Sequence, residues 1–270
     1  MPQPDAAHEV AAAAQSGSRY RTIAPQLVER LAAQELAKGH SSKEAVKAVR
    51  SKLHQVGGAY LEKPVDYAVL ESQLETLPTF LQAPEVQAFC KQTLRLHTSS
   101  NERLTIIDQF YAQTLRSLAP IRSILDMACG FNPLALPWMP AAADVQYHAC
   151  DIFSDMIEFI SRFFVHFQVA GLASVCDLSQ SLPQQPAQLA LLLKTLPCLE
   201  QLDKSLSARL LAELPADYLL VSFPVASLGG RGKGMRQNYE AHFLELTRDW
   251  SGKKQRFEFR TELVYLLSRA

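Results

Sequence analysis

The sequence lacks the segments that mark membrane, secreted and metal-binding proteins. No apolar run approaches the ~20 residues that span a bilayer. Residues 1–18 are alanine-rich and lack the basic start and apolar centre of a signal peptide, so we expect a flexible leader. The five cysteines are scattered without a C-x-x-C pair, which argues against a structural zinc or a disulfide framework. We therefore expect a cytoplasmic protein with no membrane partner and no metal.

The net charge is zero, yet the basic residues are unevenly distributed. Arg19–Lys63 contains nine Lys and Arg against four Asp and Glu, and Leu228–Arg256 contains seven against three. Two basic segments on a neutral chain are typical of a protein with a directed attraction to nucleic acid. The alternative is that both segments are ordinary solvated helix faces.

The first ~115 residues have helical periodicity. One helix is expected over residues 25–38, ending at Gly39, and Ser41-x-x-Glu44 is a capping box that opens the next. Further helices are expected over residues 66–77 and 101–118, the latter opened by a second capping box, Ser99-x-x-Glu102. In the helix after Ser41, four basic residues share one face and could follow a phosphate backbone: Lys43, Lys47, Arg50 and His54.

From Arg122 onward, short apolar runs alternate with helical stretches. The expected strands are 123–128, 145–150, 173–176, 189–193, 218–223, 256–260 and 262–268, and the expected helices are 155–169, 203–213 and 238–247. The last two strands are too close in sequence to be parallel. The pattern predicts an α/β fold, the class I (Rossmann-like) methyltransferase sheet, parallel with an antiparallel C-terminal hairpin. The expected domains are the leader 1–18, a helical domain 19–118 and a sheet domain 119–270.

Polar residues follow successive strands of the predicted sheet, where open α/β sheets bind ligands. The first strand leads into Asp126-x-Ala128-x-Gly130, which has one glycine and is therefore no dinucleotide fingerprint. Asp151 ends the second strand, where ribose hydroxyls are usually held, although it could instead cap the next helix. Asp177 ends the third strand, and Lys194 follows the fourth directly after a buried apolar run.

A loop with four glycines and two cations, Arg231 and Lys233, follows the fifth strand and suits close contact with phosphate, unless it is a mobile solvated loop. The most specific motifs are Ser222–Met235, Gly130-x-Asn132-Pro133-Leu134-Ala135-Leu136, Leu96-His97-x-Ser99-x-x-Glu102-Arg103-Leu104 and Gly58-Ala59-Tyr60. In these motifs the chain resembles the 16S rRNA (guanine-N7) methyltransferases that modify the decoding-site guanine at position 1405 and confer aminoglycoside resistance.

The resemblance implies a cofactor, S-adenosyl-L-methionine, and roles for individual residues. Arg103 would hold the methionine carboxylate, Ala128 and Gly130 would line the loop, Asp151 would bind the ribose and Asp177 the adenine. Lys194 and Glu200 match positions associated with activity, without an assigned role. Met235 and Arg236 join Arg231 and Lys233 as expected RNA contacts. The N-terminal helices would form an rRNA-docking domain.

By the same resemblance, the substrate is a guanine in helix 44 of 16S rRNA, presented by the assembled 30S subunit to a monomeric enzyme. Guanine N7 carries a free lone pair, so attack needs positioning rather than a general base. We expect His97 to be a structural hydrogen-bonding residue rather than a catalyst. Two alternatives stay open: a methyltransferase acting on another RNA, a protein or a small molecule, and a non-catalytic rRNA-binding protein.

Overall fold

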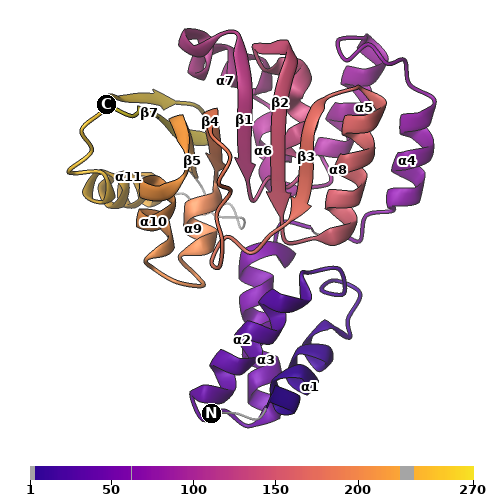
Figure 1. The fold of residues 1–270 in the computed structure, drawn as a ribbon, viewed down its shortest axis with the longest axis vertical. Helices are drawn as coiled ribbons and strands as arrows, with labels where there is room; N and C mark the ends of the chain where they lie inside the picture. The colour runs from indigo at the N-terminus through magenta and orange to yellow at the C-terminus, as the bar shows by residue number, and fades with distance from the viewer. Residues whose placement is uncertain (1–3, 62, 226–233) are drawn as a thin grey trace.

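The computed structural model describes residues 4–61, 63–225 and 234–270 (Figure 1). It begins with three helices, α1 (Pro4–Gln15), α2 (Pro25–Ala37) and α3 (Ser42–Leu53), and α3 continues into a π-helical turn, η1 (His54–Gly58). Four helices and a short 3-10 turn follow: α4 (Tyr67–Glu75), α5 (Pro84–Leu94), α6 (Thr98–Leu104), α7 (Ile107–Thr114) and η2 (Arg116–Leu118). None of the helices in these residues combines the length and hydropathy needed to cross a membrane.

Strands and helices then alternate, as the apolar pattern predicts. The strands are β1 (Ile121–Met127), β2 (Ala141–Asp151), β3 (Ala170–Val175), β4 (Ala187–Leu193), β5 (Ala216–Pro224), β6 (Lys254–Glu258) and β7 (Glu262–Ser268). Between them lie η3 (Asn132–Trp138), α8 (Ser154–His166), α9 (Thr195–Leu199), α10 (Leu206–Glu213) and α11 (Met235–Leu246). The strands form one sheet in the order β3-β2-β1-β4-β5-β7-β6, with β1 to β5 parallel and β7 antiparallel to both neighbours. The expected parallel sheet with an antiparallel C-terminal hairpin is confirmed.

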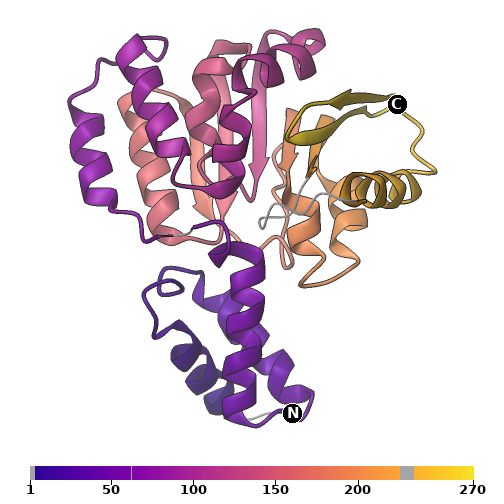
Figure 2. The same cartoon turned by 180° about the vertical axis from the view of Figure 1, so that it is seen from behind.

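Alternate residues of the strands enter two separate hydrophobic cores, one on each face of the sheet. Ile124 of β1 and Leu191 of β4 pack on the face covered by α4 to α8, whereas Leu125 and Leu192 pack on the face covered by α9 to α11. Figures 1 and 2 show these two helical layers from opposite sides. Because β2 and β4 lie on opposite sides of β1, the chain reverses its direction of travel across the sheet there, and such a switch point opens a crevice at the carboxyl ends of the strands.

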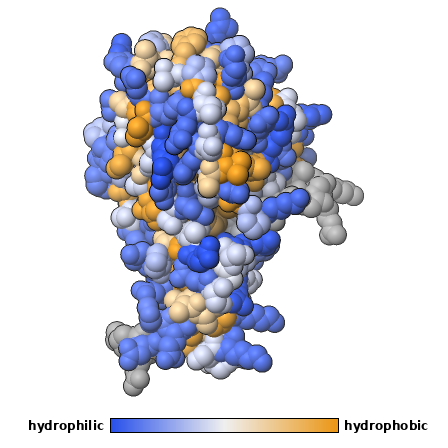
Figure 3. Space-filling model, turned by 90° about the vertical axis from the view of Figure 1, so that its right-hand side faces the viewer, coloured by the Kyte–Doolittle hydropathy of each residue, from blue (hydrophilic) through white to orange (hydrophobic). Residues whose placement is uncertain are grey.

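The first three helices form a smaller body beyond the carboxyl ends of β1 to β3 (Figure 1). In Figure 3 this body is mostly hydrophilic on the side shown, whereas hydrophobic residues gather in patches over the sheet body. Ser41 caps α3 with the reciprocal Glu44 contact that the sequence predicts, a motif that stabilises a helix by about 1 kcal/mol. Gly39 has φ +88°, as its predicted position after a helix requires.

The N-terminal segment differs from the expected flexible leader over residues 1–18. Residues 4–15 form α1, and its Val10, Ala11 and Ala14 are buried against α2 and α3. Alanine has the highest helix propensity, and these three residues give the helix an apolar stripe. We call α1 to α3 with η1 the docking module.

Two further sequence expectations are corrected by the packing. The helical domain does not extend as one unit to residue 118, because α4 packs on α8 and both α5 and α7 pack on η3, so these helices belong to the sheet body. Ser99 does not cap a helix: α6 begins at Thr98, and Ser99 is buried inside it. The expected helix 101–118 is divided between α6, α7 and η2, because the chain turns at Thr105 and Ile106 to follow the sheet.

Candidate active site

A cavity lies at the carboxyl ends of β1, β2 and β4, and the empty space within it, with its open mouth included, is about 880 Å³. Its walls come from both bodies. The docking module contributes Leu27, Val56 and Gly57, and Tyr60 follows the module directly. The sheet body contributes four of the residues expected to bind the cofactor, Arg103, Ala128, Asp151 and Asp177. It also contributes Lys194, which was expected to be associated with activity, whereas Gly130, the fifth expected cofactor residue, is not part of the lining. The structure thus gathers at one cavity residues that are up to 167 positions apart.

The loop after β1 turns tightly because two of its residues adopt the left-handed conformation. Ala128 has φ +52° and Gly130 has φ +51°. A Cβ at Gly130 would lie 2.9 Å from the His97 ring, so a side chain at this position would clash. The turn directs the Gly130 N–H to Asp151 Oδ2 at 2.9 Å. The single glycine of the motif is therefore explained by both its conformation and its close packing.

Asp151 ends β2 and faces the cavity rather than capping α8. The residue at the N-cap of α8 is Phe153, which makes no side-chain capping bond, so the capping alternative is wrong. Asp151 accepts from the Gly130 N–H through Oδ2 and from its neighbour Ile152 N–H through Oδ1. Burial raises the pKa of this carboxyl, while these backbone donors oppose the rise. The half-buried carboxylate retains acceptor capacity toward the cavity.

Asp177 follows β3 and is paired with a residue that the sequence did not suggest. Arg30 of α2 donates to Asp177 Oδ2 from Nη2 at 2.9 Å and from Nε at 3.2 Å. The other oxygen, Oδ1, accepts from the backbone N–H and the hydroxyl of Ser179 at 3.0 and 2.6 Å. The third strand end is thus tied directly to the docking module.

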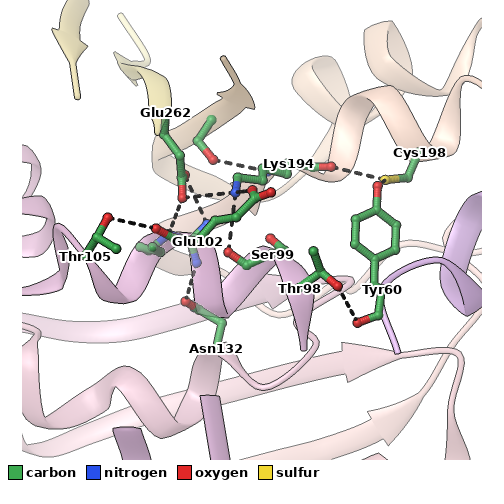
Figure 4. Close-up of polar contacts among 11 residues, drawn as sticks. Tyr60, Thr98, Ser99, Glu102, Thr105, Asn132, Lys194, Cys198 and Glu262 are labelled. Atoms are coloured by element: carbon green, nitrogen blue, oxygen red, sulfur yellow. Dashed lines mark hydrogen bonds and ion pairs between the residues drawn. The ribbon is translucent and has the colours of Figure 1, made fainter. Parts of the chain in front are cut away.

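Arg103 and Lys194 both contact Glu262 in a buried ionic cluster, and Figure 4 shows Lys194 between Glu102 and Glu262. Arg103 contacts both oxygens of Glu262, at 2.9 Å from Nε and 3.1 Å from Nη2, and Nη1 donates to Asn132 Oδ1. Lys194 Nζ donates to Glu102 and to the Ser99 carbonyl and lies 3.4 Å from Glu262 Oε1. Burial alone would raise the pKa of Glu262, but Arg103 and Lys194 outweigh it and lower that pKa.

A second buried network holds the base of the cavity. Asn132 donates to Asp126 Oδ2 at 2.8 Å, and Tyr147 donates to the same oxygen at 2.6 Å. Asn132 Oδ1 accepts from Tyr111 as well as from Arg103, so this amide joins the end of β1 to the ionic cluster. Burial raises the pKa of Asp126 to about 7, against the opposing effect of these hydrogen bonds.

His97 is packed as a neutral ring, but its Nδ1 has no hydrogen-bond partner among the described residues, so the hydrogen-bonding role expected for it is not seen. Its ring stacks on Tyr60, with centroids 5.6 Å apart, and meets Phe131 edge-on at 6.2 Å. Burial, together with the charges of Lys194 and Arg103, lowers its pKa to about 3. An imidazole that stays neutral at physiological pH is a poor general acid.

Tyr60 connects the docking module to the strand end that carries Lys194 (Figure 4). Its hydroxyl lies 2.8 Å from Cys198 Sγ, and Cys198 in turn donates to the Lys194 carbonyl at 3.2 Å. Lys194 itself has φ +60°, an uncommon conformation for a residue with a side chain. Strained residues of this kind often mark functional sites.

Three other expected site residues, Glu200, Met235 and Arg236, lie outside the cavity lining. Glu200 follows α9 and pairs with His242 of α11, Oε1 to Nε2, at 2.9 Å. Met235 is the first residue of α11, and Arg236 forms an ion pair with Glu258. Arg231 and Lys233 lie outside the residues that the structure describes.

The basic residues of α3 do not all have the same surroundings. Lys43, Lys47 and His54 are exposed on the docking module. Arg50 is also exposed, but it donates to the carbonyls of Ala13 and Ala14 and to the Ser16 hydroxyl, so it also caps the end of α1.

The sequence did not reveal which residues pair with the expected site residues Arg103 and Asp177. Glu262 was read only as a strand residue, and Arg30 only as part of a basic segment. A charged residue such as Glu262 opening an apolar strand was a usable signal, because buried charges are paired. Arg30 carried no such signal, because it lies on an amphipathic helix with an ordinary charged face.

Comparison with known proteins supports this geometry over nearly the whole chain. The family model described as "Ribosomal RNA methyltransferase (FmrO)" matches residues 16–266. The chain is 35% identical to the 16S rRNA (guanine(1405)-N(7))-methyltransferase of Micromonospora echinospora, covering 98% of this chain and 97% of that protein. It is 34% identical to the protein of the same description from Serratia marcescens, covering 94% and 95%.

Two solved structures have the same architecture throughout. The 16S rRNA methyltransferase RmtF, in complex with S-adenosyl-L-homocysteine, superimposes with a TM-score of 0.82 at 31% identity, over 100% of this chain and 99% of that chain. The 16S rRNA methylase RmtB superimposes with a TM-score of 0.80 at 28% identity, over 98% of each chain.

Proposed function

Because the chain belongs to the ribosomal RNA methyltransferase (FmrO) family, we propose that it transfers a methyl group from S-adenosyl-L-methionine to N7 of the decoding-site guanine in helix 44 of 16S rRNA. The observation that carries this proposal is the cavity at the switch point of the sheet, which is lined by Arg103, Ala128, Asp151 and Asp177. The similarity of the chain to relatives described as guanine(1405)-N(7) methyltransferases supports the choice of N7 as the methylated atom and of this guanine as the nucleotide.

The cavity fits this cofactor in its shape and in its polar groups. The tight turn after β1 places the small residues Ala128 and Cys129 at the cavity wall, which suits close passage of a narrow methionine chain. The Arg103 Nε lies 2.9 Å from Glu262 but is misaligned for a hydrogen bond, and the guanidinium keeps further N–H groups for a carboxylate. Asp151 would hold the ribose hydroxyls and Asp177 the adenine amine.

Bound in this cavity, the cofactor would supply an electrophilic methyl group on a sulfonium sulfur. The protein's task is then to orient the cofactor and the guanine toward each other and to exclude water, because guanine N7 has a free lone pair and no proton needs to leave. The geometry agrees with that task. Lys194 is surrounded by Glu102, Glu262 and the Ser99 carbonyl, and His97 is held neutral, so neither is poised to transfer a proton. We assign Lys194 a role in positioning the Glu102 and Arg103 side of the cavity.

The docking module would bind rRNA through Lys43, Lys47 and His54, and its exposed cations would offset the cost of extracting the guanine from the helix. Arg231, Lys233, Met235 and Arg236 would contact the rRNA beside the target base. The docking module and the start of α11 lie apart from each other (Figure 1). Only a folded RNA could therefore contact the basic residues of both at the same time. We therefore propose the assembled 30S subunit as the substrate of a monomeric, cytoplasmic enzyme.

N7 methylation leaves a fixed positive charge on the guanine, which would repel polycationic aminoglycosides from that site. The proposed biological outcome is therefore resistance to aminoglycosides that contact this nucleotide.

Methyl transfer from labelled cofactor to purified 30S subunits, compared with naked 16S rRNA and with 50S subunits, tests the proposal. We expect modification of 30S subunits alone, and strand cleavage specific for N7-methylguanine should map to one decoding-site nucleotide. A methyl group on another atom or another RNA would contradict the substrate assignment. Binding to 30S subunits with no transfer would instead favour a non-catalytic rRNA-binding protein.

A further inference from the structure

The Asp177 carboxylate has no vacant acceptor position. A carboxylate offers about four lone-pair positions, two on each oxygen. Ser179 fills both positions of Oδ1, through its backbone N–H at 3.0 Å and its hydroxyl at 2.6 Å. Arg30 fills both positions of Oδ2, through Nη2 at 2.9 Å and Nε at 3.2 Å. Any further donor at Asp177 must replace one of these four.

The bond that is easiest to replace comes from Arg30. A side-on arginine normally places Nε and Nη2 on two different carboxylate oxygens, but here both lie on one oxygen because Ser179 occupies the other. The Nε bond, at 3.2 Å, is the longest of the four. The Ser179 N–H belongs to the turn directly after Asp177 and cannot leave without distorting it, and the Ser179 hydroxyl makes the shortest of the four bonds, at 2.6 Å.

Arg30 also belongs to a different body from Asp177. It lies on α2, one turn after Leu27, which lines the cavity. The same module contacts the segment beyond Asp151: the Ala24 N–H donates to the Ile152 carbonyl, and the Ser154 N–H donates to the Thr22 carbonyl. The Arg30–Asp177 pair is a side-chain contact of this interface that a ligand in the cavity would meet, because Asp177 itself lines the cavity.

We propose that Arg30 is a positioning residue that acts through Asp177: it holds the carboxylate in the free protein and gives up one hydrogen bond to the adenine amine when the cofactor binds. This inference rests on the proposed function, because it assumes that the adenine lies at Asp177. Arg30 then sets how strongly the pocket selects for the amine, since the amine must replace an existing donor. It also makes cofactor occupancy loosen one tie between the docking module and the sheet body.

A ligand pair that differs only in the amine isolates this effect. Calorimetric affinities are compared for S-adenosylhomocysteine and for its analogue with hydrogen in place of the 6-amino group. For the native protein we expect S-adenosylhomocysteine to bind roughly tenfold tighter, because the amine gains one charge-assisted acceptor. In Arg30→Met the amine has no competitor, so the ratio of affinities should rise a further three- to tenfold. Arg30→Lys, whose ammonium can still donate to Oδ2, should fall between the two.

Each outcome separates the inference from the proposed function. If neither the native protein nor Arg30→Met distinguishes the two ligands, the adenine is not at Asp177, and that part of the proposed function fails. If the native protein distinguishes them but the ratio in Arg30→Met is unchanged or smaller, Arg30 does not compete for Asp177 and the inference is overturned. A purely structural Arg30 would change both affinities equally and leave the ratio constant.

Two controls complete the design. Arg162→Met removes a surface arginine paired with Glu71 and Glu158, away from the cavity, and should leave the ratio unchanged. If Arg30→Met folds poorly by circular dichroism, Arg30→Gln, which keeps a polar side chain of shorter reach, provides the measurement, and the same increase is expected.

Discussion

Replacing Glu262 by Gln tests whether the buried ionic cluster holds the active site together. Glu262 is fully buried, and its partners Arg103 and Lys194 are 3% and 5% exposed. The substitution keeps the shape of the side chain but leaves Arg103 without its counter-ion and Lys194 with Glu102 alone. Breaking a buried pair by removing one partner destabilises a protein by about 3–5 kcal/mol, because the remaining charge is unpaired away from water.

Urea denaturation of the full chain measures this free energy of unfolding directly, and thermal denaturation should show a fall in Tm of roughly 10 °C. Glu102→Gln is the matched control. Glu102 is 31% exposed and contacts one cation, so we expect a loss of about 1 kcal/mol or less. A loss for Glu262→Gln no larger than that of Glu102→Gln would refute the reasoning.

A double-mutant cycle adds a second criterion. In Glu262→Gln combined with Lys194→Met, one unpaired cation is removed, so the double variant should be destabilised by less than the sum of the two single changes. Additive effects would mean that Lys194 and Glu262 do not interact across their 3.4 Å separation.

Three further predictions concern pH, cofactor and RNA. Burial alone would raise the pKa of Glu35, but Lys38 and Lys52 outweigh burial and lower that pKa from 4.5 to about 2. This carboxylate therefore stabilises the fold above pH 4.5, and its contribution, about 3 kcal/mol, is lost as the pH falls toward 2. Acid titration of stability should therefore be shallower in Glu35→Gln, and equal slopes would contradict the assignment. Asp151→Ala should weaken S-adenosylhomocysteine binding by roughly 1–3 kcal/mol in calorimetry, and unchanged affinity would remove Asp151 from the site. Charge reversal of Lys43 and Lys47 together should weaken 30S binding and lower its salt dependence, while cofactor affinity stays the same. Arg50 is left unchanged because it caps α1. Native-like subunit binding by this variant would show that the two lysines are only solvated surface.

The sequence was sufficient for features that depend on consecutive residues. The alternation of short apolar runs with helical stretches predicted the parallel sheet, because strand and helix periods are read locally. The Ser41 capping box and the positive φ at Gly39 were likewise predicted from a few neighbouring residues. Asp151 and Asp177 could be proposed as site residues because the carboxyl ends of parallel strands share one edge of the sheet.

Tertiary structure alone decided which charges pair and where the bodies divide. Arg103 and Glu262 are 159 residues apart, and Arg30 and Asp177 are 147 apart, so no local pattern relates them. The Ser99 motif matched a capping box, but packing buried Ser99 inside α6 and turned Glu102 toward Lys194. The alanine-rich start looked like a leader, and it became α1 because α2 and α3 offer an apolar surface that its own sequence does not reveal. Local propensity is marginal for short helices in water, and burial against the rest of the chain decides the outcome.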